Sequence, residues 1–213
     1  MRAIGFDTET IQGRPYTFQL SCGETRVFYE NRSLSPKRLR TAFFNWLLRS
    51  SQDGDVLFSY NLAFEIAVLW RDELDILCKN RFAWRAPGVF VRGVAENPTP
   101  FFECWLSGKR TVRVVDACKY FGDGERTPLE KVAKAFLAKY RKLKHPTYLG
   151  ERMPRKSERE YFIKYAMTDA IITEELGKII LQWHETLAEL DPWKRGEICP
   201  SNRAVCRRRT LRG

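Results

Sequence analysis

Two acidic residues near the start of the chain, Asp7 and Glu9, are the first candidates for chemistry. They follow the hydrophobic run Met1–Phe6, and alternate positions on a strand point to the same side of a sheet. Two carboxylates held on one face repel each other, and either a raised pKa or a bound cation relieves that repulsion. A strand that ends in solvent also accommodates such a pair, so the pair alone fits both a cation site and an ordinary strand end.

A second polar pattern follows a short hydrophobic strand predicted over 56–58. Asn61 and Glu65 are four residues apart, so they share one face at the start of a helix, and Phe64 lies beside them in the sequence. Asn61 is also a favourable N-cap, and an acid in the first turn is favoured by the helix dipole. The segment therefore has a structural interpretation as well as a functional one.

The third pattern is Tyr165 and Asp169, again four residues apart, within a predicted long helix. Aspartate has a poor helical propensity at such a position, and the neighbours Ile163, Ala166 and Ala170 are apolar. A carboxylate that faces a semi-buried region is costly unless it is paired or binds a metal. A surface aspartate beside a core tyrosine would need neither, and this interpretation stays open.

The elements that position these residues are predicted from hydrophobic periodicity and turn signals. The sequence predicts strands over 2–9, 15–22, 25–30, 56–58, 88–94, 100–106 and 110–116. It predicts helices that begin at Pro36, span 61–79, run from a capping box at 127–130 to about 140, and run from a second capping box at 157–160 to about 184. This order indicates an α/β fold whose mixed sheet carries helices on both faces, with ligands bound at strand ends.

Charge and composition restrict the functional class. The 213 residues are 44% hydrophobic, which is typical of a globular domain, and the net charge is +11. Residues 1–125 contribute +2, from 17 Lys and Arg against 15 Asp and Glu, whereas residues 126–213 contribute +9, from 20 against 11. A cationic surface around an acidic pocket suits a polyanionic substrate, although a basic surface also serves solubility alone.

The remaining composition bears on metals and location. Only two histidines occur, so a histidine-based zinc site is not expected, and carboxylate ligands favour Mg²⁺ or Mn²⁺. The six cysteines form no C-x-x-C pair and are expected to be free thiols. No uncharged apolar stretch reaches about 18 residues, and no signal-peptide pattern is present. We therefore expect no membrane partner and a protein that is not secreted, located in the cytoplasm.

Taken in order, Asp7–Thr8–Glu9, Asn61-x-x-Phe64-Glu65 and Tyr165-x-x-x-Asp169 resemble the three exonuclease motifs of the DEDD superfamily, tyrosine subtype. The resemblance is closest to the proofreading exonuclease domain of family B DNA polymerases and spans about residues 2–180. It implies a ribonuclease-H-like exonuclease domain over 1–190, followed by a basic tail over 191–213. The chain departs from the family at Glu65, where the family has aspartate.

The resemblance implies a metal-dependent 3′–5′ exonuclease that removes nucleotides from single-stranded DNA ends with two Mg²⁺ or Mn²⁺ ions. It implies that the ions are held by four carboxylates, Asp7, Glu9, Glu65 and Asp169. It implies that the Tyr165 hydroxyl orients the attacking water. Contacts to nucleic acid are implied for Thr8, Asn61, Phe64, Thr127, Leu129 and Lys144. Lys142 is an alternative to Lys144 for the lysine that precedes the third motif in protein-primed relatives.

Substrate and partners are less determined by the motifs. Single-stranded DNA is the expected substrate and RNA is possible, because no residue pattern identifies contacts to a 2′-hydroxyl. A DNA polymerase or another replication protein is a candidate partner. Two alternative functions are a nucleic-acid-binding module whose catalysis is weakened by Glu65, and the exonuclease part of a longer family B polymerase. Release of mononucleotides that depends on metal separates the enzyme from the binding module.

Overall fold

The computed structural model describes residues 1–73, 80–95, 99–121 and 127–190, so the predicted tail over 191–213 lies outside the described residues. The strands form one eight-stranded sheet in the order β3-β2-β1-β4-β8-β7-β6-β5. Their bounds are β1 Ala3–Ile11, β2 Arg14–Cys22, β3 Thr25–Glu30, β4 Val56–Ser59, β5 Arg81–Ala86, β6 Val89–Val94, β7 Phe101–Leu106 and β8 Arg110–Asp116. Strands β1, β4 and β8 pair in parallel, and the other neighbours pair antiparallel. The predicted α/β class with a mixed sheet is confirmed, and the order is compatible with a ribonuclease-H-like fold.

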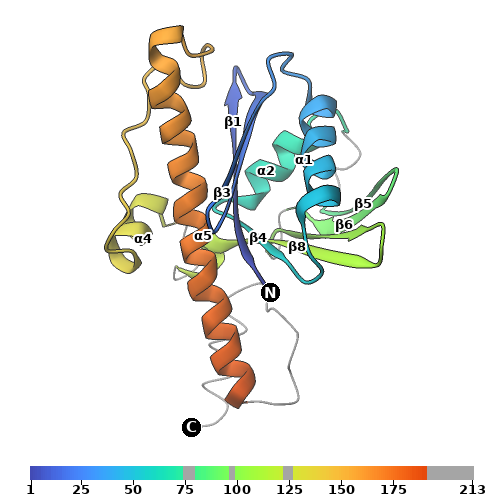
Figure 1. Cartoon of the computed structure of the whole chain (residues 1–213). Helices are drawn as coiled ribbons and strands as arrows, with labels where there is room; N and C mark the ends of the chain where they lie inside the picture. The colour runs from blue at the N-terminus through green and yellow to red at the C-terminus, as the bar shows by residue number, and fades with distance from the viewer. Residues whose placement is uncertain (74–79, 96–98, 122–126, 191–213) are drawn as a thin grey trace.

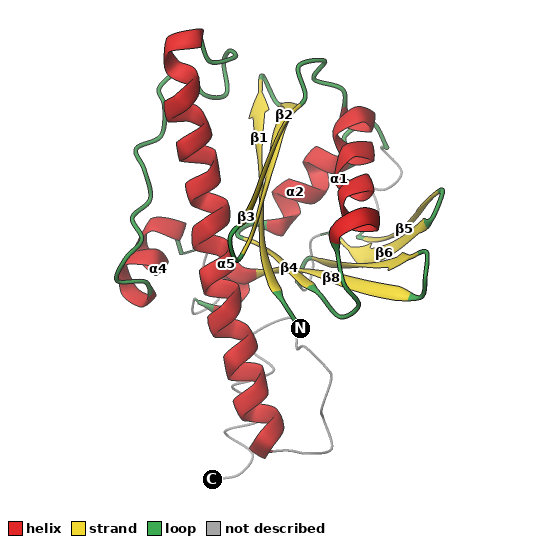
Figure 2. Cartoon of the chain, in the orientation of Figure 1, coloured by secondary structure: helices red, strands yellow, loops and turns green. Residues whose placement is uncertain are grey.

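Helices cover both faces of the sheet, as predicted (Figures 1 and 2). Their bounds are α1 Pro36–Ser50, α2 Leu62–Leu69, α4 Leu129–Phe136 and α5 Arg159–Leu190, with 3₁₀ helices η1 Ala117–Tyr120 and η2 Lys156–Glu158. Ile4 and Phe6 of β1 pack on one face in a cluster with Phe43 of α1. Ala3 packs on the other face in a cluster with Ile180 of α5. Within the described residues, no helix combines the length and the apolar character needed to cross a membrane.

Two glycines allow α5 to lie directly against the sheet. A Cβ atom placed on Gly5 of β1 would be 1.8 Å from the carbonyl oxygen of Ala170 in α5. A Cβ atom on Gly177 of α5 would be 2.3 Å from the ring of Phe58 in β4. Real Cβ atoms need about 3.5–4.0 Å, so a larger residue at either position would push the helix away. The close approach brings the first half of α5 to the carboxyl end of β1.

The helix predicted over 61–79 is wrong in length, because α2 ends at Leu69. The buried Arg40 of α1 donates to the Leu69 carbonyl oxygen at 2.8 Å and pairs with Asp72, which satisfies the end of the helix. Trp70 follows as the C-cap residue and is fully buried among core aromatic rings. Residues 74–79 of the predicted helix lie outside the described part of the chain.

Both predicted capping boxes are also wrong. The N-cap residue of α4 is Pro128, which makes no side-chain cap hydrogen bond, and the helix ends at Phe136, before the predicted end near residue 140. The chain enters α5 through η2, where the Glu158 carboxylate accepts from the Arg155 backbone N–H at 2.7 Å, so Ser157 is not the cap. Helix α5 then continues to Leu190, beyond the predicted end near residue 184.

One strand was not predicted. Strand β5 pairs with β6 in a hairpin whose turn is Pro87–Gly88, and Gly88 adopts φ 76°, the left-handed conformation that glycine tolerates. The sequence signal was the Pro-Gly turn pair itself, which implies a strand on each side.

The contact between α5 and β4 makes a prediction about stability. At an exposed helix position, Gly→Ala stabilises by about 1 kcal/mol through helix propensity. We expect Gly177→Ala to lower the free energy of unfolding by about 1–3 kcal/mol, because the new methyl group overpacks against Phe58. Chemical denaturation measures the change, and Gln182→Ala, at an exposed position of the same helix, is the near-neutral control. A Gly177→Ala protein more stable than the parent would contradict the packing.

Candidate active site

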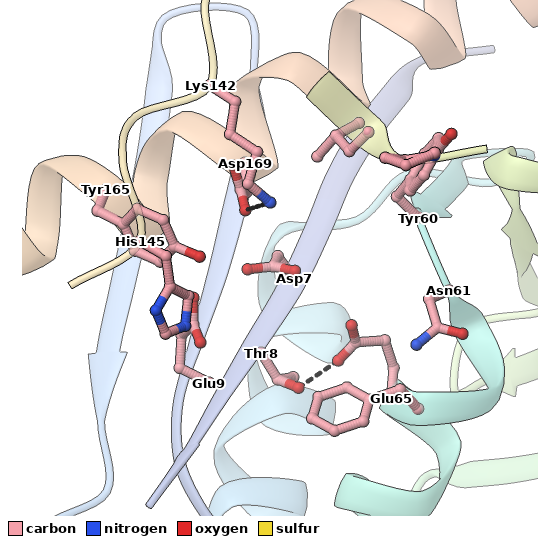
Figure 3. A pocket seen from close by; sticks show the side chains of 13 residues that line it. Asp7, Thr8, Glu9, Tyr60, Asn61, Glu65, Lys142, His145, Tyr165 and Asp169 are labelled. Carbon is pink, nitrogen blue, oxygen red and sulfur yellow. Dashed lines mark hydrogen bonds and ion pairs between the residues drawn. The ribbon is translucent and has the colours of Figure 1, made fainter. Parts of the chain in front are cut away.

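A pocket of about 580 Å³ lies beside the second half of β1 and at the carboxyl end of β4, within the size range of ligand sites. Strand β1 continues to Ile11, so Asp7 and Glu9 lie within the strand and not at the predicted strand end. Side chains from β1, α2, the start of α4, the following loop and α5 line it (Figure 3). The lining residues are Asp7, Thr8, Glu9, Tyr60, Asn61, Phe64, Glu65, Pro128, Leu129, Lys142, His145, Tyr165 and Asp169. The structure thus brings together the predicted catalytic residues, all five of them.

Asp7 occupies the centre of the pocket. It lies between Asp169, which comes from α5, and Glu65, which comes from α2 (Figure 3). Glu9 lies two residues further along β1, and a register shift between Glu9 and Thr10 interrupts the pairing of β1 with β2 directly after it. Such bulges commonly occur beside active sites, where they aim a side chain.

The four carboxylates perturb one another. Burial raises the pKa of Asp7 well above its usual value, and the charges of Glu65, Glu9 and Asp169 raise it further. Burial, with the charge of Asp169, raises the pKa of Glu9 to about 8. Burial also raises the pKa values of Glu65 and Asp169, while the ammonium of Lys142 opposes the shift at Asp169. The pocket therefore disfavours negative charge unless a cation compensates it.

Glu65 is 2% exposed and accepts a hydrogen bond from the Thr8 hydroxyl. Thr8 alternates with Asp7 and Glu9 along β1, so its side chain points to the opposite face, where α2 lies. The side chain of glutamate is long enough to reach the strand at this point. Sequence reasoning assigned Thr8 to nucleic acid and missed its contact with Glu65; the alternation along the strand was the available signal.

Lys142 lies in the pocket and Lys144 does not. The Lys142 ammonium is 2.7 Å from the Asp169 carboxylate. Although burial opposes its charge, Asp169 and the other acids raise the pKa of Lys142, so it is a cation at neutral pH. Lys144 is exposed, and its carbonyl oxygen accepts from the Tyr161 hydroxyl at 2.8 Å. Of the two lysines that the sequence offered, the structure therefore places only Lys142 in the pocket.

Tyr165 is buried, and its ring packs edge-on against His145 with the centroids 5.6 Å apart. Burial and the nearby charges of Glu9 and Asp169 raise the pKa of the Tyr165 hydroxyl, so it stays protonated and can donate a hydrogen bond. His145 is a further residue that the sequence did not identify, because no spacing pattern links it to the other members of the pocket.

Of the residues predicted to contact nucleic acid, Asn61, Phe64 and Leu129 line the pocket, whereas Thr127 does not. Asn61 adopts φ 141°, a strained conformation for a residue other than glycine, and its side chain makes no cap hydrogen bond to α2. Phe64 is 41% exposed at the pocket wall, and Leu129 lines the pocket from the start of α4. Thr127 lies outside the lining, and its carbonyl oxygen accepts from the Tyr60 hydroxyl.

Carboxylate oxygens are the donors that Mg²⁺ and Mn²⁺ prefer. Asp7 Oδ2 and Asp169 Oδ1 are buried and have no hydrogen-bond partner in the described structure, so a cation facing them would satisfy both. Among the described residues, no three or more His, Cys, Asp or Glu side chains are grouped closely enough to hold a metal ion as they stand. Donor type and charge therefore fit a hard cation, while the carboxylates do not form a closed ligand cage.

No family model matches the sequence, and no curated protein matches it. The resemblance to the DEDD motifs therefore stays a prediction.

The contact between Thr8 and Glu65 predicts a cost for removing the hydroxyl. Thr8→Val keeps the shape of the side chain but leaves a buried acceptor unsatisfied. We expect the free energy of unfolding to fall by about 1–3 kcal/mol in chemical denaturation. Thr8→Ser retains the hydroxyl and should lose much less. Equal losses for the two variants would show that the hydrogen bond is not the cause.

The raised pKa of Glu9 predicts a dependence of stability on pH. The pKa of Glu9 rises from an ordinary value of 4.5 in the unfolded chain to about 8 in the fold. The contribution of Glu9 to the free energy of unfolding therefore becomes less favourable as the pH rises from 4.5 to 8. In chelator, we expect Glu9→Gln to stabilise the protein, relative to the parent, more on the alkaline side of this range than on the acidic side. Thermal unfolding at both ends of the range measures this, with the exposed Glu24→Gln as the control. A difference in stability between Glu9→Gln and the parent that does not change with pH would contradict the raised pKa of Glu9.

Proposed function

We propose that the chain is a metal-dependent 3′–5′ exonuclease that hydrolyses the terminal phosphodiester bond of single-stranded DNA. The observation that carries this proposal is the gathering of four carboxylates and a buried tyrosine, from three distant segments, in one pocket: Asp7, Glu9, Glu65, Tyr165 and Asp169. Two unpartnered, buried carboxylate oxygens support it further, because such atoms favour a cation. RNA is the second substrate to be tested.

Divalent ions held by Asp7, Glu9, Glu65 and Asp169 would supply Lewis acidity to the attacking water and to the leaving oxygen. The protonated Tyr165 hydroxyl is suited to donate to or orient a water molecule, and its raised pKa makes it a poor base. The Lys142 ammonium would offset negative charge on a phosphate that lies beside Asp169.

The last nucleotides of the substrate would be held by residues at the start of α2. The side chain of Asn61 offers hydrogen bonds, and the exposed Phe64 ring offers a stacking surface. An enzyme of this kind would act beside a DNA polymerase or another replication protein, where the genome is copied. It would work either as a free chain or as the exonuclease part of a longer polymerase.

Digestion of end-labelled single-stranded DNA and RNA, with Mg²⁺, Mn²⁺ or chelator, tests the proposal. We expect mononucleotides to be released from the 3′ end only when a divalent ion is present. Asp7→Asn and Asp169→Asn should each reduce the rate by roughly 100-fold or more, because placement of the reacting groups is lost. Glu24→Gln, in the exposed β2–β3 turn, should behave as the parent.

An Asp7→Asn protein as fast as the parent, or digestion that survives chelation, would overturn the assignment. Binding of single strands without any hydrolysis by the parent would favour the alternative of a nucleic-acid-binding module. Two observations favour that alternative. Glu65 is hydrogen-bonded to Thr8, and among the described residues the carboxylates are not grouped closely enough to hold a metal ion as they stand.

A further inference from the structure

Three aromatic side chains, Phe121, Phe136 and Trp183, cluster between the end of α4 and the second half of α5. We call this cluster the aromatic platform. The ring centroids are 4.9 Å apart for Phe121 and Phe136, 5.4 Å for Phe121 and Trp183, and 6.2 Å for Phe136 and Trp183. Phe136 is 48% exposed and Trp183 is 38% exposed. Rings that gather on a surface in this way mark a binding surface more often than isolated exposed residues do.

Helix α4 links the platform to the pocket. Helix α4 begins at Leu129 in the pocket wall and ends at Phe136, and the seven steps between these two residues correspond to about 10 Å of helix. Tyr60 in the pocket wall and Phe121 in the platform pack against the same apolar cluster beneath α4. A strand of a few nucleotides whose end lies in the pocket would therefore reach the platform along α4.

The segment that joins the two is strongly basic. Residues 127–144 contain six Lys and Arg and one acid, Glu130. Five of the six basic side chains are exposed, namely those of Lys131, Lys134, Lys139, Arg141 and Lys144. Cations beside accessible rings are the combination that single-stranded nucleic acid requires, since cations pair with phosphates and rings stack on bases.

In a second group of aromatic and basic residues, on β5, β6 and β7, the rings are half-buried and each already has a cation beside it. Phe90 and Trp105 stack with centroids 5.4 Å apart, but the guanidinium of Arg85 lies 4.7 Å from the first ring and that of Arg92 lies 4.5 Å from the second. Arg92 is also paired with Glu103. These side chains satisfy one another across the strands, so this group serves as a comparison for the platform.

We propose that the aromatic platform binds single-stranded nucleic acid by stacking on bases that lie on the 5′ side of the nucleotide held in the pocket. The direction of the strand rests on the proposed exonuclease function, whereas stacking on the platform does not. The exposed lysines and Arg141 contact the phosphates between the two sites. The platform therefore sets the preference for longer strands over dinucleotides.

The test uses the full chain carrying Asp169→Asn, so that hydrolysis does not interfere, and fluorescence anisotropy with labelled oligothymidylate. In this background, Phe136→Leu with Trp183→Leu keeps apolar volume but removes the ring faces. We expect binding of a strand of about 12 nucleotides to weaken about tenfold or more, and binding of a dinucleotide to stay unchanged. Phe136→Tyr with Trp183→Phe should retain the binding of the longer strand, because it keeps two rings.

Trp105→Leu is the matched control and should leave binding unchanged. The proposal is overturned if this control weakens binding as much as the platform variant, or if the platform variant binds the longer strand as tightly as the parent. It is also overturned if an abasic strand of the same length binds as tightly as oligothymidylate. A platform variant that binds normally but changes its oligomeric state would assign the platform to protein contact instead.

The outcome is independent of catalysis. Platform-dependent binding by a parent protein that hydrolyses nothing would support the platform and overturn the exonuclease proposal. Metal-dependent hydrolysis with no effect of the platform variant on binding would support the exonuclease proposal and overturn the platform. Binding of DNA and RNA oligonucleotides of the same length and sequence, measured in the same assay, shows which of the two the platform prefers.

Discussion

The close contact between α5 and β1 is the constraint on which the candidate site depends. Because Gly5 has no side chain, the backbone of α5 at Ala170 approaches the strand directly. Asp169, one residue before that contact, is therefore held opposite Asp7. If α5 lay one side chain further out, the carboxylates from the two segments would face each other across solvent. The arrangement of the acids is thus a consequence of how the helix packs on the sheet.

Acids elsewhere in the chain are treated differently from those in the pocket. Glu30 and Glu158 pair with Arg159 and Arg152, and these partners lower the pKa of each carboxyl despite any opposing effect of burial. In the pocket, by contrast, burial and like charges outweigh Lys142 and raise the pKa of Asp7. Arginine partners are thus supplied to Glu30 and Glu158, whereas Asp7 Oδ2 and Asp169 Oδ1 are buried without a hydrogen-bond partner in the described structure. Perturbed groups gathered in a pocket are instead typical of a functional site.

Local patterns in the sequence were sufficient for most of the strands. They marked the acids as candidates, but the complete set of four came from the resemblance to the DEDD motifs. Alternation placed Asp7 and Glu9 on one face, and helical spacing placed Tyr165 and Asp169 together, and both follow from backbone geometry alone. The end of α2 at Leu69 could not be predicted in this way, because it depends on Arg40, which lies far away in the sequence. Contacts between distant segments override local propensity.

The choice of Lys142 over Lys144, and the contact between Thr8 and Glu65, were not predicted for a similar reason. Both lysines belong to one irregular basic segment, where no periodicity indicates which side chain turns inward. Thr8 and Glu65 lie on different elements, and only the packing of α2 on the sheet brings them together. Fold class is thus readable from local rules, whereas the pocket positions of Lys142 and His145, and the contacts that hold each side chain, require the tertiary structure.

The basic segment 127–144 and the acidic pocket beside it carry opposite charges, and this affects how any phosphate-containing ligand binds. The basic segment 127–144 attracts a polyanion, but the pocket beside it holds four carboxylates against one lysine, Lys142. A phosphate can enter that pocket at low cost only when cations offset the acids, so binding of cation and of phosphate must favour each other. Because such coupling is reciprocal, a substrate end would also raise the affinity for the cation. The pocket would then accept a strand end only in its cation-bound state.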